Sequence, residues 1–441
     1  MDFEGSTKKK TPENAFGTYQ SHGSMLIANS EEVLKAHDID NGWDWTKVPG
    51  ATTMTLTLSQ IRLKKARNFS PLSYAGGVTY KGPEPLSSGV FGMDFHQPEY
   101  QFFDEDHPYR KVKLHFKKSV FFFQNVLVCL GSNIKIDNGG TTKAQTTLFQ
   151  DKLVRSASEF SIKINDKTKG SSDIGKAGNP LSADPKRGYT TLVDTKGNSY
   201  YIPGSSASDL KVHIQNQNSK TAAVVDSSGI YATAWLEHSS TNAKYEYAVF
   251  VKTDSYRSTA TANWDRLHTN LNRVLYSVLQ QDDKAHVVQF GISPQRNAII
   301  TPLYGYVIFD ATSKLPKGGL ITKVTKQCRI MVEQNSRSVF LSISYPDLNF
   351  NVNGELKTSG DVNKEELYEL ESREVEIEVT LSVNVKTTLS DSAVIVHGSP
   401  AGYQPRVEVK RLASSPPPGK GKIIAFKNLK NGFSVEVKLE K

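Results

Sequence analysis

Short runs in which apolar and polar residues alternate are the sequence feature that most limits how this chain can fold. The runs are rich in valine, isoleucine, threonine and aromatic residues, and they span residues 53–63, 111–123, 125–136, 245–253 and 373–387. Successive side chains of an extended strand point to opposite faces, so a period of two is typical of β-strands. β-branched and aromatic residues also favour strands. We therefore predict a chain built largely of β-strands.

Turn-forming residues separate these runs. Glycine and asparagine tolerate the positive φ angles of tight hairpin turns. Such signals occur at Asn138-Gly139-Gly140, Lys196-Gly197-Asn198, Asn353-Gly354 and Asn431-Gly432. Helical patterns are scarce: the candidates are Ser30–Ala36, which begins with a serine cap, and Thr261–Leu279, which fits either a helix or an irregular loop. Because strands do not alternate with helices, we predict an all-β class with packed antiparallel sheets.

Composition excludes several classes of protein. The 441 residues include 54 Lys+Arg and 45 Asp+Glu, a net charge of +9. The two cysteines, Cys129 and Cys328, are too few for a disulfide framework or a cysteine-type zinc site, and we predict buried, inert thiols. No apolar stretch is long enough for a transmembrane helix, and the start MDFEGSTKKK lacks the apolar region of a secretory signal. These features predict a soluble, basic, globular protein.

A change of pattern near residues 316–326 predicts a domain boundary. There the segment PKGGLITKVTKQ joins a tyrosine-rich strand region to a new alternating run. We place the two domains at residues 1–320 and 321–441. The Pro/Gly-rich stretch 414–422 is interpreted as a loop between terminal strands.

Motifs for nucleotide or metal chemistry are not found, and no cofactor is expected. The glycine-rich segment 74–82 lacks the GK[ST] ending and the strand-to-helix context of a phosphate loop. The ten histidines show no HExxH or paired spacing, and His238 is interpreted as a structural residue. Calcium remains open, because an oxygen-ligand site leaves no signature outside EF-hand-type loops.

Two tryptophans stand out in the segment NGWDWTKVPGATT, residues 41–53. Trp43 and Trp45 would point to the same side of an extended strand. Flat aromatic faces stack on sugar rings or bases, and they also fill hydrophobic cores, so both interpretations stay open. The pair Pro49-Gly50 then predicts a turn into the next strand.

Basic clusters occur at Lys8–Lys10, Lys64–Arg67 and Lys117–Lys118. They fit either ordinary solvated faces or a surface for a polyanion, and the polyanion would be nucleic acid or an acidic polysaccharide. Because no helix-turn-helix, zinc-finger or RNP-type motif is present, nucleic acid has no support from the sequence.

Several segments together resemble one enzyme family. They are PENAFGTYQSHGS (12–24), WDWTKVPGATT (43–53), AGGV with GVFGMDF (75–95), KKSVFFFQNVLVCLGSNI (117–134), TTLFQ (146–150), AWLEHS with YEYAVF (234–250) and SYPDLNF (344–350). Their order resembles the C-terminal part of polysaccharide lyase family eight, the chondroitin and hyaluronan lyases, with the chondroitinase ABC group most similar. WDW…PGATT followed by LGSNI is the most specific part, and the resemblance weakens after about residue 355.

The resemblance implies an architecture. Family members have an incomplete α-toroid, then a large antiparallel β-supersandwich, then a small β-sandwich. The chain would hold a remnant of the toroid-to-sheet connection at 1–25, the supersandwich up to residue 320, and the C-terminal sandwich at 321–441. We therefore expect its polar start to be an interior cut of a longer protein.

The resemblance also implies a chemistry, β-elimination beside a uronic acid. This reaction needs a neutralised carboxylate, a base for the C5 proton and an acid for the leaving oxygen. In the family a His, a Tyr and a carboxylate-binding Asn come from the toroid, and these segments are absent from this sequence. The place of an Arg-containing stretch is taken by MDFEGSTKKK, whose Lys8–Lys10 offer charge without a bidentate fork.

An acidic residue of the β-domain normally completes the family's site. The aligned position here is Ser88, and the nearby Glu84 is our candidate for that catalytic role if the loop shifts. A solvated loop glutamate between two prolines is the alternative interpretation of Glu84.

We expect the chain to form one wall of a cleft for an acidic polysaccharide. The predicted substrate-binding residues are Glu13, Asn14, Tyr19, His22, Trp43 and Trp45. The expected function is that of the β-domain portion of a lyase for chondroitin sulfate, dermatan sulfate or hyaluronan, with the isolated chain inactive. The alternatives are a non-catalytic module that binds acidic polysaccharide and a structural module that supports the toroid.

The expected partners are the acidic polysaccharide and the missing toroid portion. Neither nucleic acid nor a membrane is expected as a partner, and no metal site is assigned. The family resemblance implies a secreted or periplasmic protein.

Overall fold

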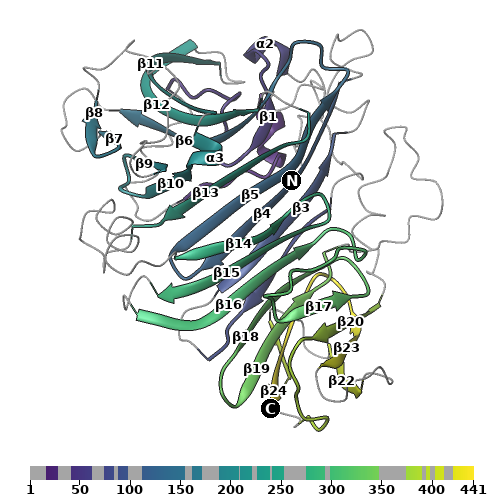
Figure 1. Cartoon of the computed structure of the whole chain (residues 1–441). Coiled ribbons are helices and arrows are strands. Elements are labelled where there is room, and N and C mark those ends of the chain that lie inside the picture. The colour runs from purple at the N-terminus through teal and green to yellow at the C-terminus, as the bar shows by residue number, and fades with distance from the viewer. Residues whose placement is uncertain are drawn as a thin grey trace. The chain divides into compact units, whose positions relative to one another are not determined.

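The structure is a computed structural model, and almost all of the residues that it describes lie in or between β-strands (Figure 1). This confirms the predicted all-β class. The described residues are 16–27, 41–61, 74–83, 88–97, 112–153, 161–170, 188–207, 209–220, 226–238, 241–252, 275–293, 298–346, 374–389, 394–397, 403–411 and 421–441.

The chain divides into two compact units. The first comprises Met1–Ser73, Met93–Lys118 and Asn125–Arg273, and the second comprises Tyr74–Gly92, Ser119–Gln124 and Val274–Lys441. The predicted division into domains 1–320 and 321–441 stays a prediction.

The first unit contains two groups of antiparallel strands. One is a four-stranded sheet in the order β1 (Thr52–Met54), β6 (Ala144–Leu153), β12 (Asp226–His238), β11 (Leu210–Lys220). The other runs in the order β3 (Ser88–His96), β4 (Lys113–Phe123), β5 (Val126–Asp137), β13 (Ala243–Phe250), β10 (Ser199–Pro203), β9 (Tyr189–Val193), β7 (Ile162–Ile164), β8 (Lys167–Lys169), of which β3 belongs to this unit from Met93 on and β4 up to Lys118. Its short helices are η1 (Gly17–Ser21), α2 (Leu58–Ile61) and α3 (Gly204–Ala207).

The second unit is a sandwich of two antiparallel sheets. The seven-stranded sheet has the order β14 (Tyr276–Gln281), β15 (Ala285–Ser293), β16 (Ala298–Ile308), β18 (Cys328–Gln334), β19 (Ser338–Ser344), β24 (Ser434–Glu440), β21 (Val394–His397). The four-stranded sheet has the order β17 (Ile321–Val324), β20 (Val375–Leu381), β23 (Lys422–Leu429), β22 (Arg406–Arg411). The strand β2 (Tyr74–Tyr80) also belongs to this unit.

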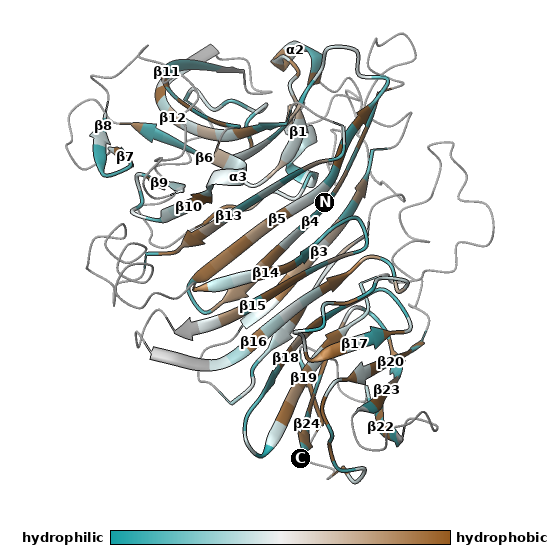
Figure 2. Cartoon of the chain, in the orientation of Figure 1, coloured by the Kyte–Doolittle hydropathy of each residue, from teal (hydrophilic) through white to brown (hydrophobic). Residues whose placement is uncertain are grey.

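The alternation in the sequence sets which faces are buried. Along β20 the valine, isoleucine and leucine side chains are buried, whereas the residues between them are exposed or half-buried. They join one hydrophobic core with buried residues of both sheets of the second unit, such as Ile330, Leu341 and Phe426. By contrast, β5 is buried along most of its length, and Figure 2 shows long hydrophobic stretches on it. An uninterrupted apolar run is typical of a strand covered on both faces.

The predicted turns between strands are confirmed where the structure describes them. Asn138 and Gly140 have positive φ angles between β5 and β6, as does Gly197 between β9 and β10. Asn431 and Gly432 do the same between β23 and β24. The signal at Asn353-Gly354 lies outside the described residues.

Two predicted elements need correction. The alternating run 53–63 was predicted to be one strand, but β1 ends at Met54 and the helix α2 follows. The cause is a local capping box, because Gln60 Oε1 accepts hydrogen bonds from both the N–H (2.8 Å) and the hydroxyl (2.9 Å) of Thr57. The segment 261–279 was predicted as helix or loop, but its end belongs to the strand β14. This strand pairs with β15 in a hairpin, and the Asp282 side chain accepts hydrogen bonds from N–H groups of the turn between them. The predicted helix Ser30–Ala36 lies outside the described residues.

Buried thiols and structural histidines behave as predicted. Cys129 and Cys328 are both free and fully buried, and burial raises their thiol pKa values to about 11 and about 12, which keeps them protonated and unreactive. His238 is buried, with Nε2 2.8 Å from the Thr146 hydroxyl. Within the described part of the chain, none of the helices has the length and apolar character needed to cross a bilayer.

Candidate functional site

The predicted site residues fall into two groups. Glu13, Asn14 and Glu84 lie outside the described residues. Tyr19, His22, Trp43 and Trp45 are described, belong to the first unit, and are all buried. The geometry of the segments 16–27 and 41–50 around them therefore defines the candidate site.

The segment 16–27 enters the core of the first unit through η1. Tyr19 donates its hydroxyl to the Met54 carbonyl (3.1 Å), and Thr18 donates to the Ile61 carbonyl (3.2 Å). The His22 ring packs edge-on against Tyr19, with 5.0 Å between centroids, and lies 4.4 Å from the Phe95 ring. These contacts fix the end of the segment against β1, α2 and β3.

Burial decides the protonation of this pair. It lowers the pKa of His22 to about 3 and raises that of Tyr19 well above its ordinary value, because both side chains are about 1% exposed. At neutral pH the imidazole is therefore neutral and the phenol keeps its proton. Both side chains act as packing groups in this arrangement, and their predicted contacts with substrate stay predictions.

The tryptophan segment 41–50 is a series of turns, not an extended strand. Asp44 Oδ1 accepts the Thr46 N–H (2.8 Å) and the Thr46 hydroxyl (2.6 Å), which bends the chain between the two tryptophans. The Trp43 and Trp45 rings consequently meet edge to face at 6.4 Å, and Trp43 also meets Tyr231 of β12 at 6.3 Å. With exposures of 3% and 6%, the two indoles fill the core, as the packing alternative predicts, and stacking on sugar stays a prediction.

Two glutamines of β6 hold this segment in place. Gln150 accepts the Asp44 N–H (2.8 Å) and donates to the carbonyls of Asp44 (3.2 Å) and Lys47 (3.1 Å). Gln145 donates to the Thr46 carbonyl (3.0 Å) and accepts from the Lys47 ammonium. Buried polar groups need such partners, so the glutamines give the turns one conformation.

The sequence did not reveal these glutamines, and a β-bulge explains why. An odd and an even position normally face opposite sides of a strand. The register between β6 and β12 shifts at Ala234/Trp235, so that Thr147 pairs with Trp235 and Phe149 pairs with Ala234. The extra residue turns Gln145 and Gln150 to the same face.

A buried lysine joins the two segments of the candidate site. Lys118 of β4 donates its ammonium to the carbonyl oxygens of Gly23 and Gly50, and its side chain is about 1% exposed. Burial lowers its pKa to about 8. In the predicted basic cluster Lys117–Lys118, Lys118 is thus a buried residue that holds backbone segments and is not part of the surface. The clusters Lys8–Lys10 and Lys64–Arg67 lie outside the described residues.

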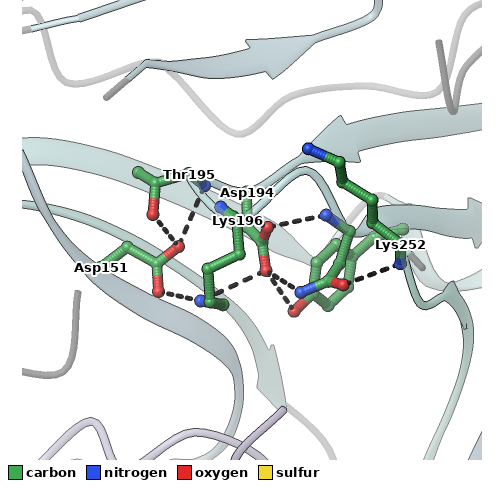
Figure 3. A network of polar contacts seen from close by, with 7 residues as sticks. Asp151, Asp194, Thr195, Lys196 and Lys252 are labelled. Carbon is green, nitrogen blue, oxygen red and sulfur yellow. Dashed lines mark hydrogen bonds and ion pairs between the residues drawn. The ribbon is translucent and has the colours of Figure 1, made fainter. Parts of the chain in front are cut away.

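A second buried ionic network lies between β6 and the β9–β10 hairpin (Figure 3). The Lys196 ammonium contacts Asp151 and lies 3.3 Å from Asp194 Oδ2. Asp194 also accepts the N–H groups of Lys196 and Asn198 (2.9 Å each). Although burial favours the neutral amine, the carboxylates of Asp151 and Asp194 hold the pKa of Lys196 above its ordinary value. The network fixes the hairpin and is closed to solvent.

The buried polar side chains of the candidate site act on the backbone around them. The candidate site's buried groups orient backbone segments, and among the described residues no cluster of three or more His, Cys, Asp or Glu side chains is arranged to hold a metal ion. Ser88, the position at which the sequence resemblance predicts the family's acid, begins β3 and is buried at 8% exposure.

The fold is a set of antiparallel sheets, and the comparisons with known proteins identify the family to which it belongs. The model of the polysaccharide lyase family 8 super-sandwich domain matches residues 6–263. The chain belongs to polysaccharide lyase family 8, as its motifs predicted.

Curated relatives agree with this membership. The chain is 26% identical over 353 residues to the chondroitin sulfate ABC exolyase of Bacteroides thetaiotaomicron, covering 76% of this chain and 30% of that protein. It is 26% identical over 393 residues to the chondroitin sulfate ABC endolyase of Proteus vulgaris, covering 83% and 34%. The chain thus spans about a third of the length of these curated relatives.

The fold itself occurs in solved lyase structures. A xanthan lyase from Paenibacillus superposes with a TM-score of 0.64 at 19% identity, covering 100% of this chain and 35% of that one. A chondroitin AC lyase from Streptomyces coelicolor superposes with a TM-score of 0.58 at 17% identity, covering 97% and 44%. At such identities the likeness concerns the fold alone.

Proposed function

We propose that this chain is the β-domain portion of a glycosaminoglycan lyase that acts by β-elimination beside a uronic acid. The observation that carries the proposal is the match to the family 8 super-sandwich domain, together with relatives named as chondroitin sulfate ABC lyases. The proposed substrate class is chondroitin sulfate, dermatan sulfate or hyaluronan. Family resemblance also supports a secreted or periplasmic location.

In this proposal the base and the acid come from a His and a Tyr in a toroid portion outside this chain. The buried state of His22 and Tyr19 supports this division of labour. An imidazole with a pKa of about 3 is a weak proton acceptor, and efficient general bases have pKa values near the working pH. The described residues then serve to hold the substrate-facing loops.

Residues next to these anchored points are our candidates for substrate contact. Glu13 and Asn14 lie three and two positions before the buried Phe16. Glu84 comes two positions after Gly82, whose N–H donates to Glu436 Oε1 at 2.9 Å. We propose Asn14 as a hydrogen-bond donor to the sugar chain, Glu13 as a group that orients neighbouring donors, and Glu84 as the acidic residue of the site.

A binding and turnover experiment tests the function. The purified chain is titrated with chondroitin sulfate at low salt, and the ultraviolet absorbance of the unsaturated uronate product is followed in parallel. We expect binding without turnover. Rapid growth of absorbance would show that the chain carries its own base and acid, and absence of any binding would refute the polysaccharide cleft.

Matched variants assign the binding to the proposed residues. Asn14→Ala is expected to weaken binding, whereas Asn216→Ala, at an exposed position of β11, is the control and should leave it unchanged. If both variants bind like the parent chain while chondroitin sulfate is still bound, the cleft lies elsewhere and the chain acts as a general polysaccharide-binding module.

A further inference from the structure

A lysine and two aspartates meet in a deeply buried part of the first unit (Figure 3). The Lys196 ammonium contacts Asp151 Oδ1 and lies 3.3 Å from Asp194 Oδ2. The lysine side chain is 4% exposed, and both aspartate side chains are fully buried. A nucleophile, an electrophile and a proton acceptor, which are the groups that amide formation requires, therefore lie together away from solvent.

Two donors hold one oxygen of Asp151, and the other oxygen faces the lysine. Asp151 Oδ2 accepts hydrogen bonds from the Thr195 N–H (3.1 Å) and the Thr195 hydroxyl (2.8 Å). Donors placed in this way stabilise the negative charge that develops on Oδ2 when a nucleophile attacks the carboxyl carbon. Oδ1, which contacts the Lys196 ammonium, is then the oxygen that leaves.

Asp194 is placed to take a proton from the lysine. Its carboxylate is fixed within the β9–β10 turn, because it accepts the N–H groups of Lys196 and Asn198 and the Asn198 side-chain amide. Burial raises the pKa of Asp194, so this carboxylate takes up a proton more readily than an exposed aspartate. Although burial favours the neutral amine, the two carboxylates raise the pKa of Lys196. The attacking amine therefore forms by proton transfer to Asp194.

We propose that Lys196 and Asp151 condense to an intramolecular isopeptide bond. The bond between Lys196 Nζ and Asp151 Cγ forms, and the bond between Asp151 Cγ and Oδ1 breaks. One ammonium hydrogen stays on the amide nitrogen, and the others reach Oδ1 through Asp194, so that Oδ1 leaves as water. The charges of ammonium and carboxylate cancel, no atom is oxidised or reduced, and no co-reactant is required.

Contact and burial both favour the amide over the ion pair. Groups held in a reactive orientation behave as if they were at an effective concentration of about 10⁵–10⁸ M. Condensation also replaces two buried ions by a neutral group, which removes their desolvation penalty. Hydrolysis would require water to return to side chains that are at most 4% exposed, so the bond persists once it has formed.

The bond joins the two sheets of the first unit. Asp151 lies in β6 of the four-stranded sheet, whereas Lys196 lies in the turn between β9 and β10 of the other sheet. Asp151 also directly follows Gln150, which holds the tryptophan segment 41–50 through Asp44. The cross-link thus fixes the strand that carries this segment, and its formation does not depend on the proposed function.

Intact mass spectrometry of the denatured whole chain tests the bond. Denaturation breaks ion pairs but not amides, so the parent chain should be lighter than its sequence mass by one water molecule. Trypsin does not cleave after an acylated lysine, so a digest should contain one branched peptide that joins residues 144–152 to residues 188–211. A parent chain with the full mass of its sequence would overturn the inference.

Three variants assign the bond to these side chains, and circular dichroism checks that each one folds. Lys196→Arg keeps the positive charge without the reactive amine and should have the full mass of its sequence. Asp194→Asn keeps both condensing groups but removes the proton acceptor, so most of the chain should stay uncondensed.

Lys252→Arg is the matched control. The Lys252 N–H donates to Asn198 Oδ1 (3.1 Å), whereas Figure 3 shows its side chain pointing away from both carboxylates. This variant should lose one water molecule as the parent does. Loss of water by Lys196→Arg, or complete condensation in Asp194→Asn, would contradict the proposed reaction.

Discussion

Acidification should destabilise the first unit through its buried histidines. Burial lowers the pKa of His22 to about 3 and that of His238 to about 4, against an ordinary value of 6.5. Below pH 6.5 these histidines therefore bind protons in the unfolded chain but stay neutral in the folded chain. Their contribution to the free energy of unfolding is thus fully present above pH 6.5 and is lost as the pH falls. The loss continues until each folded pKa is reached.

The magnitude follows from the pKa differences. At pH 5 the solution is 1.5 pH units below the unfolded pKa of each histidine. At about 1.4 kcal/mol per unit, each histidine then lowers the free energy of unfolding by about 2 kcal/mol. The two together contribute about 4 kcal/mol, a large share of the stability of an ordinary domain. Lowered pKa values of His115 and His213, for which burial is the leading cause, act in the same direction.

Urea denaturation followed by tryptophan fluorescence measures the effect. All four tryptophans of the chain fall within the residues of the first unit, so the signal reports on that unit. On acidification to pH 5, the free energy of unfolding of the parent chain should fall by about 4 kcal/mol because of the two histidines. In His22→Gln the fall should be about 2 kcal/mol smaller, because glutamine does not titrate. The matched control is His397→Gln, which removes a histidine of the second unit that pairs with Glu436. It should leave the pH dependence of the tryptophan signal like that of the parent.

One result would refute the reasoning. If His22→Gln and the parent lose stability with the same slope, the imidazole titrates near its ordinary pKa in the folded chain. That outcome would place His22 outside the core in an open cleft, where its predicted contact with substrate would be favoured.

Three further changes test the packing of the candidate site. Trp45→Ala should cost about 3–5 kcal/mol in urea denaturation, because it empties a core position, whereas an indole stacked on sugar from solvent would cost little stability. Lys196→Met leaves Asp151 and Asp194 buried without their cation and should cost about 3–5 kcal/mol, with part of the loss recovered when both carboxylates are also changed to asparagine. Gly42→Ala should cost more than about 1 kcal/mol, since its φ is +97° and a Cβ would come within 2.4 Å of the β12 backbone, and an unchanged urea midpoint would contradict this close approach.

The sequence predicted strands well where one physical signal acted alone. The runs 111–123 and 125–136 became β4 and β5 because alternation, β-branched residues and flanking turns all favoured strands. The run 53–63 failed because Thr57 and Gln60 form a capping box, a local interaction that outweighs the alternation of the surrounding residues. A T-x-x-Q pattern inside an alternating run was the visible warning.

The candidate site was less predictable because its geometry depends on distant residues. The rule that positions i and i+2 share a face holds only for extended chain, and Asp44 bends the chain between Trp43 and Trp45. Burial of this segment requires Gln150, 106 positions further along the chain, and a bulge that no local pattern reveals. Residue types and motif order could therefore indicate the family, but not whether the indoles face solvent or core.

Buried polar groups in the first unit contact loop backbone more than one another. Gln145 and Gln150 bind the segment 44–47, and Lys118 binds the carbonyls of Gly23 and Gly50. Apolar side chains in those places would fill the same space but would leave backbone groups of the loops unsatisfied, at about 1–3 kcal/mol each. Chemistry on a polysaccharide requires donors and acids held within a fraction of an ångström, so loops tied by directional bonds serve a lyase better than loops held by apolar contact alone. On this argument we propose that the buried glutamines and lysine serve the proposed site by positioning its loops, without touching the sugar.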